Sequence, residues 1–537
     1  MQRYRLLKVI LLGMALIGPL LGCDDETSDN DGANSGGMDV PGEGGAPGVG
    51  GQPGMGGTPT MGGTPAMGGD PGVGGDPGVG GDPGAGGDPG AGGDPGAGGD
   101  PGAGGAPGMG GEAAVPMVHD ALAEMCPRGG NPSRFPNATT RGNEDLHKLT
   151  LDAPDAVCND GSPALLFVRR ASMNTNKWVF FLQGGGGCLD HASCRDRWCG
   201  ADTAYDASKM SSRFIEPAAI GGTGILHADP RNPFHDANAV YVYYCTSDQW
   251  TGRRSDVVLP TEEGGAPYRI HFRGHSILEG MLAVLREGDA TSDDGAVVLP
   301  DLDDATDIVW SGVSAGGAGA THTLDWFAGH FDAAQTRVLG AIDAGFGPTF
   351  DHYSEATAAA FTEYATARYR DSWSPFFDAF LDPSCVAHAN SQGDAAWRCS
   401  DPVYVKFNHV TTPFFQRLDL RDRVGSRGPI ALGATLQEFA AGAAATLASL
   451  RTIRDTALEA DDIDFVPGVY GPNCTQHVGI TNNQFFLQTT VEDTNGEALT
   501  FAAALGRWSA GEDVEAIDSP ITAERNSVCA DPTDDRS

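Results

Sequence analysis

The sequence predicts an α/β fold in which helices are layered on a mostly parallel central sheet, and two observations support it. Short apolar runs, each followed within a few residues by Gly, Asp or Ser, are typical of buried strands; they are residues 178–182, 239–244, 307–310, 338–342 and 412–418. Helical patterns such as 276–286 and 436–457 lie between or after these runs. Strands that alternate with helices form parallel sheets, whose functional sites lie at the carboxyl ends of the strands.

The N-terminal part is predicted to lie outside this fold. Residues 1–22 combine a basic start, a short apolar run and a small residue before Cys23, which predicts a secretory signal peptide. The end of this segment, Leu-Leu-Gly-Cys, resembles a bacterial lipobox, so Cys23 is the predicted lipidation site; ordinary signal cleavage is the alternative. Residues 23–115 are rich in Gly and Pro and carry a six-residue repeat, which predicts a disordered linker. Residues 116–537 then form the folded domain.

Charge and hydropathy exclude several classes of protein. The chain has a formal net charge of −37, and residues 113–537 alone hold 31 basic against 57 acidic side chains. Such a domain repels phosphate backbones, so nucleic acid is not an expected partner. After the first 25 residues no stretch is long and apolar enough to span a bilayer, which excludes a multi-span transporter. We expect a monomeric, exported lipoprotein, anchored through Cys23 on the periplasmic or cell-surface side of a membrane.

Ten cysteines follow Cys23, and an even number in an exported chain predicts disulfides. Cys188, Cys194 and Cys199, with His191 between them, have a spacing that a metal could use, but in an exported protein we expect local disulfides there. The acidic stretch 293–307 lacks the ligand spacing of an EF-hand. No metal and no cofactor are therefore expected.

One strand end carries a motif with clear chemistry. Residues 307–320 read DIVWSGVSAGGAGA, an apolar strand followed by Gly-Val-Ser-Ala-Gly and a helix start rich in small residues. This arrangement is typical of a nucleophile elbow, where a strained turn exposes a serine at the top of an α/β-hydrolase sheet. Ser314 is therefore the predicted nucleophile of an α/β-hydrolase-like domain.

A serine hydrolase also needs amides for the oxyanion and a histidine oriented by a carboxylate. Ala315 supplies one amide by geometry, and the four glycines 184–187 after the strand 178–182 are placed to supply others. His477 follows a strand-like run, 463–470, whereas His322 lies within the helix after the elbow and is expected to pack or face solvent. For the acid, the residues alone leave two candidates nearly tied, Asp419 and Asp422, with Asp343 as a third.

The chain also resembles the pectin acetylesterase family, which includes the Notum-like serine carboxylesterases. The resemblance rests on CNDGSPA at 158–164, WVFFLQGGGGC at 178–188, YYCTSDQWTG at 243–252 and SAGGAG at 314–319. Shorter matches are GTGIL, Asn232-Pro233, TTPFFQRLDLRD and NCTQH, in the order of the family. The blocks cover residues 156–345 best.

The resemblance resolves the acid and completes the site. The family's catalytic Asp follows the Pro of its strand by nine positions, which corresponds to Asp422, and its His follows a Cys by three, which corresponds to His477. It implies a catalytic triad of Ser314, Asp422 and His477 and an oxyanion hole of Gly185, Gly186 and Ala315. The glycine run departs from the family, which usually has an aromatic residue where this chain has Gly186 and Gly187, and Glu where it has Gln183.

The implied activity is carboxylic ester hydrolysis of O-acetyl or O-acyl groups on an extracellular glycan or another acylated molecule. The acidity of the domain disfavours a polyanionic glycan unless arginines form a local basic groove; the candidates are Arg253, Arg254, Arg417, Arg421 and Arg423. The alternatives are a tethered, non-catalytic glycan-binding or adhesion module, because fold does not fix function, and a serine protease.

Overall fold

The computed structural model describes residues 115–520, with gaps at 124–125, 127–144, 174, 202–204, 262–264, 394–395 and 459, together with Cys126 and Cys529. The predicted signal peptide, the lipidation site Cys23 and all but the last residue of the predicted linker lie outside the described residues. The boundary at residue 116 is therefore an expectation that the structure leaves open.

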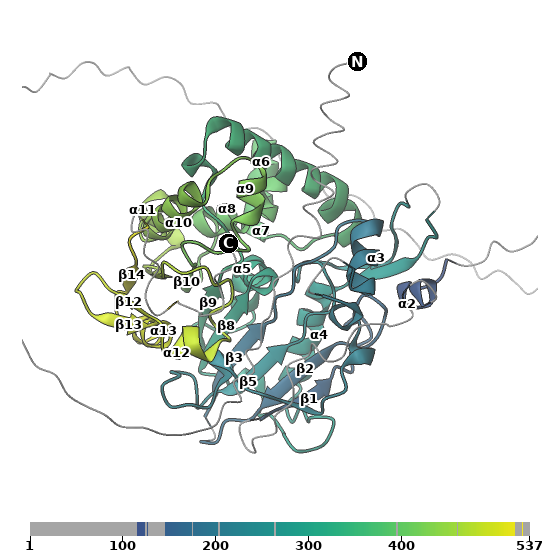
Figure 1. Cartoon of the computed structure of the whole chain (residues 1–537). Coiled ribbons are helices and arrows are strands. Elements are labelled where there is room, and N and C mark those ends of the chain that lie inside the picture. Colours follow the sequence, from purple (N-terminus) through teal and green to yellow (C-terminus); the bar gives the residue numbers. More distant parts are fainter. Residues whose placement is uncertain are drawn as a thin grey trace, which may run out of the picture. The chain divides into compact units, whose positions relative to one another are not determined.

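A large mixed sheet runs through the domain (Figure 1). Within the described residues it has ten strands in the order β14-β11-β10-β9-β8-β3-β5-β2-β1-β4. Strands β14 to β5 of this order pair in parallel, whereas β2, β1 and β4 pair antiparallel at one edge. The strands of the sheet are β1 (Asp145–Thr150), β2 (Leu165–Arg169), β3 (Lys177–Leu182), β4 (Ala219–Gly221), β5 (Asn238–Val242), β8 (Asp307–Val313), β9 (Arg337–Asp343), β10 (Phe414–Arg417), β11 (Gly468–Gly471) and β14 (Glu515–Ile517). The mostly parallel α/β architecture predicted from the sequence is confirmed.

Helices and two small hairpins surround the sheet. The helices are α2 (Val118–Leu122), α3 (His191–Cys199), α4 (Gly274–Arg286), α5 (Ala315–Ala328), α6 (Glu355–Arg368), α7 (Pro383–Gln392), α8 (Pro402–Asn408), α9 (Arg427–Ala431), α10 (Leu436–Leu450), α11 (Ile453–Thr456), α12 (Asn483–Leu487) and α13 (Phe501–Ser509). The hairpins pair β6 (Arg254–Val258) with β7 (Arg269–Phe272) and β12 (Thr490–Glu492) with β13 (Ala498–Thr500). Helices α6 to α9 gather together, at the top of Figure 1.

The hydrophobic core explains why the central strands read as continuous apolar runs. All five residues of β2 are buried, and in β3 and β8 all but the first residue are buried. A sheet covered on both faces produces this pattern, because each strand then buries alternate side chains in two directions; this holds for the parallel strands β3 and β8 and also for β2, which pairs antiparallel. In the described part of the chain, no helix is long and apolar enough to cross a membrane.

The sequence patterns misplaced some boundaries. The run 412–418 becomes a strand only at Phe414, after Pro413, whose missing N–H cannot join a ladder. The run 463–470 likewise begins its strand only at Gly468, after Pro467. The helical pattern 436–457 breaks after Leu450 and resumes at Ile453. The antiparallel edge strands were not predicted.

Five disulfides pair the ten described cysteines, as expected for an exported chain. They are Cys126–Cys199, Cys158–Cys245, Cys188–Cys194, Cys385–Cys399 and Cys474–Cys529. The three cysteines whose spacing a metal could use are all bonded in this way. Among the described residues no group of three or more His, Cys, Asp or Glu side chains is arranged to hold a metal ion.

Candidate active site

Ser314 occupies the turn between β8 and α5. Its backbone is strained, with φ 55° and ψ −122°, a region that non-glycine residues rarely adopt. Two glycines make the turn possible, since a Cβ on Gly312 would lie 2.2 Å from the Gly316 carbonyl oxygen and one on Gly316 would lie 2.0 Å from the Leu182 carbonyl oxygen. The strand, the strained serine and the tightly packed helix start together have the geometry of a nucleophile elbow.

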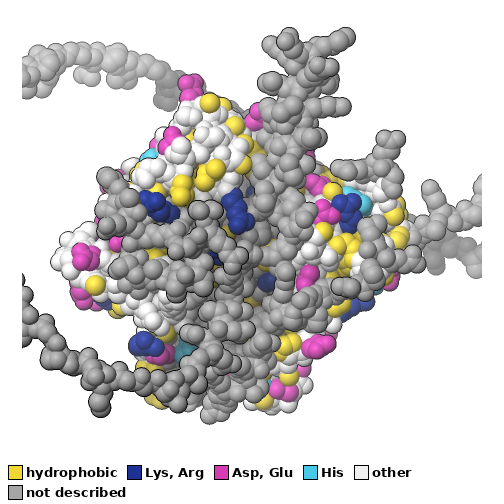
Figure 2. Space-filling model, viewed as in Figure 1, with side chains coloured by type: hydrophobic (Ala, Val, Ile, Leu, Met, Phe, Trp, Pro, Cys, Tyr) yellow, Lys and Arg dark blue, Asp and Glu magenta, His cyan; other side chains and the backbone are white. Residues whose placement is uncertain are grey.

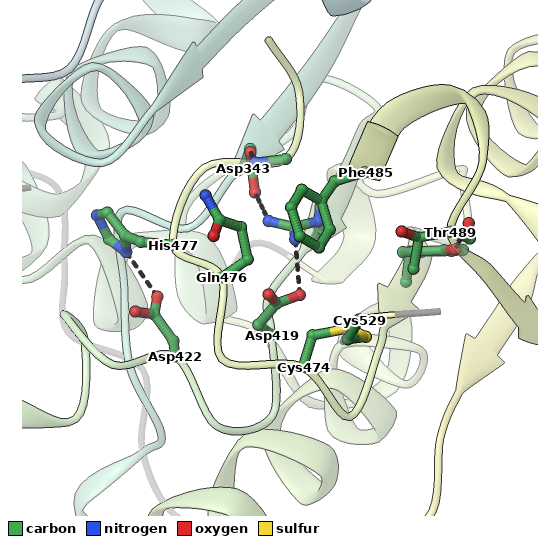
Figure 3. Close-up of polar contacts among 12 residues, drawn as sticks. Asp343, Asp419, Asp422, Cys474, Gln476, His477, Phe485, Thr489 and Cys529 are labelled. Carbon is green, nitrogen blue, oxygen red and sulfur yellow. Dashed lines mark hydrogen bonds and ion pairs between the residues drawn. A yellow bond between two sulfur atoms is a disulfide. The ribbon is translucent and has the colours of Figure 1, made fainter. Parts of the chain in front are cut away.

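His477 and Asp422 lie side by side on two loops that follow neighbouring strands (Figure 3). His477 Nδ1 is 2.6 Å from Asp422 Oδ2, and both residues are buried. The second carboxylate oxygen of Asp422 accepts hydrogen bonds of 2.8 Å from the amides of Val424 and Gly425. Every oxygen of this carboxylate therefore has a partner, and the carboxylate fixes the orientation of the imidazole.

The charge state of Asp422 results from two opposing effects. Burial alone would raise the pKa of its carboxyl group, because it disfavours the charged form. The neighbouring His477, with its charge and hydrogen bond, and the amides of Gly425 and Val424 outweigh burial and hold the pKa below its ordinary value. Asp422 is thus an ionised carboxylate at neutral pH, as a histidine-orienting acid has to be.

Asp343 and Asp419, the other two acid candidates, form a different cluster (Figure 3). Arg417 at the end of β10 donates to Asp343 Oδ1 at 2.5 Å and to Asp419 Oδ1 at 2.6 Å, and all three side chains are fully buried. The contact of 2.6 Å with His477 belongs to Asp422. The geometry therefore separates the residues that sequence spacing alone had left nearly tied.

One cavity brings the remaining candidates together. It has a volume of about 380 Å³, and Ser314, Ala315, His477 and Gly186 all contribute to its lining. Its apolar walls include Leu189, Ala318, Phe346, Phe377 and Val424, and its polar walls include Asp190, Ser247, Gln249, Tyr364 and Arg368. The predicted nucleophile, the predicted base and two of the predicted oxyanion donors thus line one cavity with mixed walls.

The glycine loop passes directly over the elbow. A Cβ on Gly184 would lie 2.6 Å from the Val313 carbonyl oxygen and 3.0 Å from the Ser314 Cβ. Gly185 and Gly186 have φ values of +144° and +60°, which favour glycine. Gly186 contributes to the cavity lining, whereas Gly185 is not one of the lining residues. The predicted role of Gly185 as an oxyanion donor therefore rests on its backbone amide and is a proposal.

The departure at Gly187 has a visible structural consequence. A Cβ there would lie 2.7 Å from the Ser247 carbonyl oxygen, which accepts a hydrogen bond from the Cys188 amide at 3.1 Å. The loop at Ser247 therefore occupies the space beside the glycine run. An aromatic side chain at position 187 would require the loop at Ser247 to move. The cavity wall beside Gly187 is therefore shaped differently from the wall of a protein that has an aromatic residue there.

The loop 247–250 lines the cavity through Ser247 and Gln249, and the sequence analysis predicted no role for it. Ser247, Gln249 and Trp250 have φ values of 57°, 56° and 66°. Asp248 holds this strained loop, because its carboxylate accepts hydrogen bonds from the Thr246 hydroxyl and from the amides of Trp250 and Gly274. No sequence signal predicts left-handed backbone at three non-glycine residues, so only the structure reveals this wall.

The arginines that were candidates for a basic groove and the helical His322 lie in different surroundings. Arg417 is buried in its ion pairs and therefore cannot line a basic groove, whereas Arg253 and Arg254 are exposed and donate to carbonyl groups of the segment 375–378. On the face seen in Figure 2, basic and acidic side chains of the described residues are interspersed. His322 packs in the core against Trp373, and burial lowers its pKa to about 3, as expected for a packing residue.

Comparisons with known proteins agree with this architecture. The sequence model of the family described as Pectinacetylesterase matches residues 140–530. Palmitoleoyl-protein carboxylesterase NOTUM of Drosophila melanogaster is 26% identical over 369 residues, which cover 68% of this chain and 48% of that relative. The carboxylesterase of the same name from Homo sapiens is 32% identical over 221 residues, 40% of this chain and 39% of that relative. The chain therefore matches less than half the length of each of these two relatives.

A solved structure is also similar in fold. The structure of the Wnt deacylase Notum from Drosophila, crystal form I, aligns with a TM-score of 0.51 at 22% sequence identity. The alignment covers 72% of this chain and all of that chain. At this level of identity the likeness concerns the fold, which is that of the α/β-hydrolase-like domain described above.

Proposed function

The chain belongs to the pectinacetylesterase family, and on that premise we propose that it is a serine carboxylesterase acting on O-acetyl or O-acyl esters. The proposed catalytic residues are Ser314, His477 and Asp422. The single observation that supports this most is the contact of 2.6 Å between His477 and Asp422 at the same cavity that Ser314 lines. A pure binding module has no need for a strained serine and an oriented imidazole in one space.

In the proposed mechanism, Ser314 Oγ attacks the ester carbonyl carbon while His477 accepts its proton. Asp422 keeps His477 in the tautomer whose Nε2 accepts that proton and stabilises the imidazolium that forms. Amides of the glycine loop, Gly185 and Gly186, and of Ala315 stabilise the oxyanion. His477 then protonates the leaving alcohol, and a water molecule repeats the sequence on the acyl-enzyme to release the acid.

The substrate proposal follows from the cavity. Its volume of about 380 Å³ is at the low end of small-molecule pockets, which are roughly 300–1,000 Å³, so a short acyl group and the adjoining part of its alcohol would together fill it. Both charge signs occur in the lining, through Asp190 and Arg368, so the alcohol part of the substrate is polar. We therefore propose an acetylated or short-chain acylated extracellular glycan as the substrate class.

We propose that the protein is held on the periplasmic or cell-surface side of a membrane. The five disulfides agree with export. A lipid on Cys23 would hold the domain at the membrane through the Gly/Pro-rich linker, and a substrate fixed in an extracellular layer would then be within reach.

The function can be tested with residues 113–537, folded with their disulfides, on p-nitrophenyl acetate, butyrate and palmitate. We expect hydrolysis that falls with acyl length and that drops at least about 10³-fold in Ser314→Ala. Ser449→Ala is the matched control, because Ser449 is an exposed helical serine whose hydroxyl bonds only the Ala445 carbonyl of its own helix. Wild-type hydrolysis no faster than that of Ser314→Ala would refute the esterase and leave the tethered binding module.

A further inference from the structure

Asp343 is a buried acidic residue beside the site to which the mechanism gives no role. It is the last residue of β9 and is fully buried. It is one of the two carboxylates that hold Arg417, but it also makes contacts that its partner Asp419 lacks. These contacts reach the turn that carries Ser314 and the loop that carries His477.

The backbone of Asp343 supports the nucleophile elbow. Its carbonyl oxygen accepts a hydrogen bond of 3.1 Å from the amide of Ser314. The next turn of α5 lies against the same oxygen, since a Cβ on Gly317 would be 2.7 Å away from it. The position of Ser314 is therefore tied to the end of β9.

The side chain of Asp343 supports the histidine loop. Its Oδ2 accepts hydrogen bonds of 2.7 Å from the amides of both Gly479 and Ile480. Gly479 follows His477 by two residues, and a Cβ on it would lie 2.3 Å from the Arg417 guanidinium carbon. The loop after His477 is thus pressed onto the Arg417–Asp343 pair and bonded to it.

We propose that Asp343 is a positioning residue that fixes His477 relative to Ser314, through its side chain on one side and its backbone on the other. This inference rests on the proposed function. It differs from a simple charge-balancing role for Arg417, which Asp419 shares: among the described residues, the Asp419 carboxylate bonds Arg417 and none of the amides after His477.

The matched pair of variants is Asp343→Asn and Asp419→Asn. Each replaces one carboxylate partner of Arg417 by an amide, so both are expected to lose thermal stability. In Asp343→Asn the charged guanidinium attracts the amide oxygen, which leaves the new NH₂ group facing the N–H groups of Gly479 and Ile480. Two facing donors repel, so only this variant pushes the histidine loop away.

We expect Asp343→Asn to lower kcat about 10- to 100-fold with KM within about twofold, since small misplacements of a catalytic group cost this much. Asp419→Asn should keep kcat within about threefold. A second readout is the low-field proton resonance of the His477–Asp422 hydrogen bond, identified by its loss in His477→Ala. It should disappear or shift in Asp343→Asn and persist in Asp419→Asn.

Equal kcat losses in the two variants, or an unchanged resonance in Asp343→Asn, would overturn the proposal. If Asp343→Asn does not fold, Gly479→Ala tests the same contact from the loop side, and wild-type kcat and resonance in that variant would equally overturn it. If wild-type protein hydrolyses no ester, the proposed function fails, and the resonance alone then decides whether Asp343 positions His477.

Discussion

At the scale of single residues, burial and hydrogen bonding give three buried aspartates different surroundings. Asp422 stays ionised because His477 and two amides offset its burial. Asp419, bonded to Arg417, has a pKa raised well above its ordinary range, mainly by burial. Asp248 is also buried, but amides and a hydroxyl surround it. The same side chain is therefore an orienting acid, a partner of a buried cation or a loop anchor, according to its neighbours.

Asp248 gives a pH-dependent prediction. Burial raises the pKa of its carboxyl group to about 6, although hydrogen bonds from Thr246, Gly274 and Trp250 oppose the shift. The folded state therefore binds this proton more tightly than the unfolded state, and the resulting stability is full below about pH 4 and is lost as the pH rises through 6. A shift of about two units corresponds to about 3 kcal/mol.

We expect the stability difference between wild type and Asp248→Asn to shrink by up to about 3 kcal/mol from pH 4 to pH 7.5, because only the wild type loses this contribution. Unfolding temperatures of both proteins across that range measure the effect. Asp401, whose pKa burial also raises to about 6, titrates in both proteins and cancels in the difference. Parallel pH curves for the two proteins would contradict the assignment.

At the scale of elements, glycines allow the elbow, the glycine loop and α5 to pack closely. The helix start at Gly316 lies against the end of β3, where the glycine loop begins. Direct backbone contact therefore fixes the turn of the predicted nucleophile relative to the loop that is predicted to supply oxyanion amides. A side chain at this contact would separate them.

Gly316→Ala is expected to destabilise the domain by about 1–3 kcal/mol or more and to reduce kcat, because the added methyl group would lie 2.0 Å from the Leu182 carbonyl oxygen. Gly428→Ala in α9 is the control, since nothing lies within 4 Å of the added Cβ. Relief of the helical glycine penalty should leave that variant unchanged or stabilise it by up to about 1 kcal/mol. Thermal unfolding and esterase kinetics of both variants measure these effects. Identical behaviour of the two variants would disprove the close contact at Gly316.

At the scale of the whole molecule, the anchor and the catalytic unit are expected to be independent. The sheet begins at Asp145, far along the chain from the predicted lipidation site Cys23. We predict that Cys23→Ser abolishes incorporation of labelled fatty acid in the full chain, and that residues 113–537 have the same kcat/KM as the full lipidated chain on a soluble ester. Labelling that persists in Cys23→Ser would contradict lipidation at this residue. A kcat/KM that differs between the two proteins would show that residues before 113 affect catalysis.

Much of the fold and part of the site could be predicted from local patterns. The central strands appear as apolar runs because a doubly covered parallel sheet buries both faces of each strand. The family resemblance is confirmed by the match over residues 140–530. Two of the strands that were missed, β4 and β14, are three residues long and carry too few apolar positions to show a period. The roles of Ser314, Asp422, His477 and the oxyanion residues remain predictions.

The α/β class, the elbow around Ser314 and the cysteine content expected of an exported protein follow from the sequence, because each depends on residues close together in the chain. The pairing of the cysteines and the loop that lines the cavity become known only from the folded structure, which also brings Asp422, the acid that the family resemblance indicates, into contact with His477. Asp422 and His477 are 55 positions apart, and Asp343 is more than 130 from the amides that it binds. Contacts over such separations depend on how the sheet brings its strand ends together, and no local period encodes that arrangement.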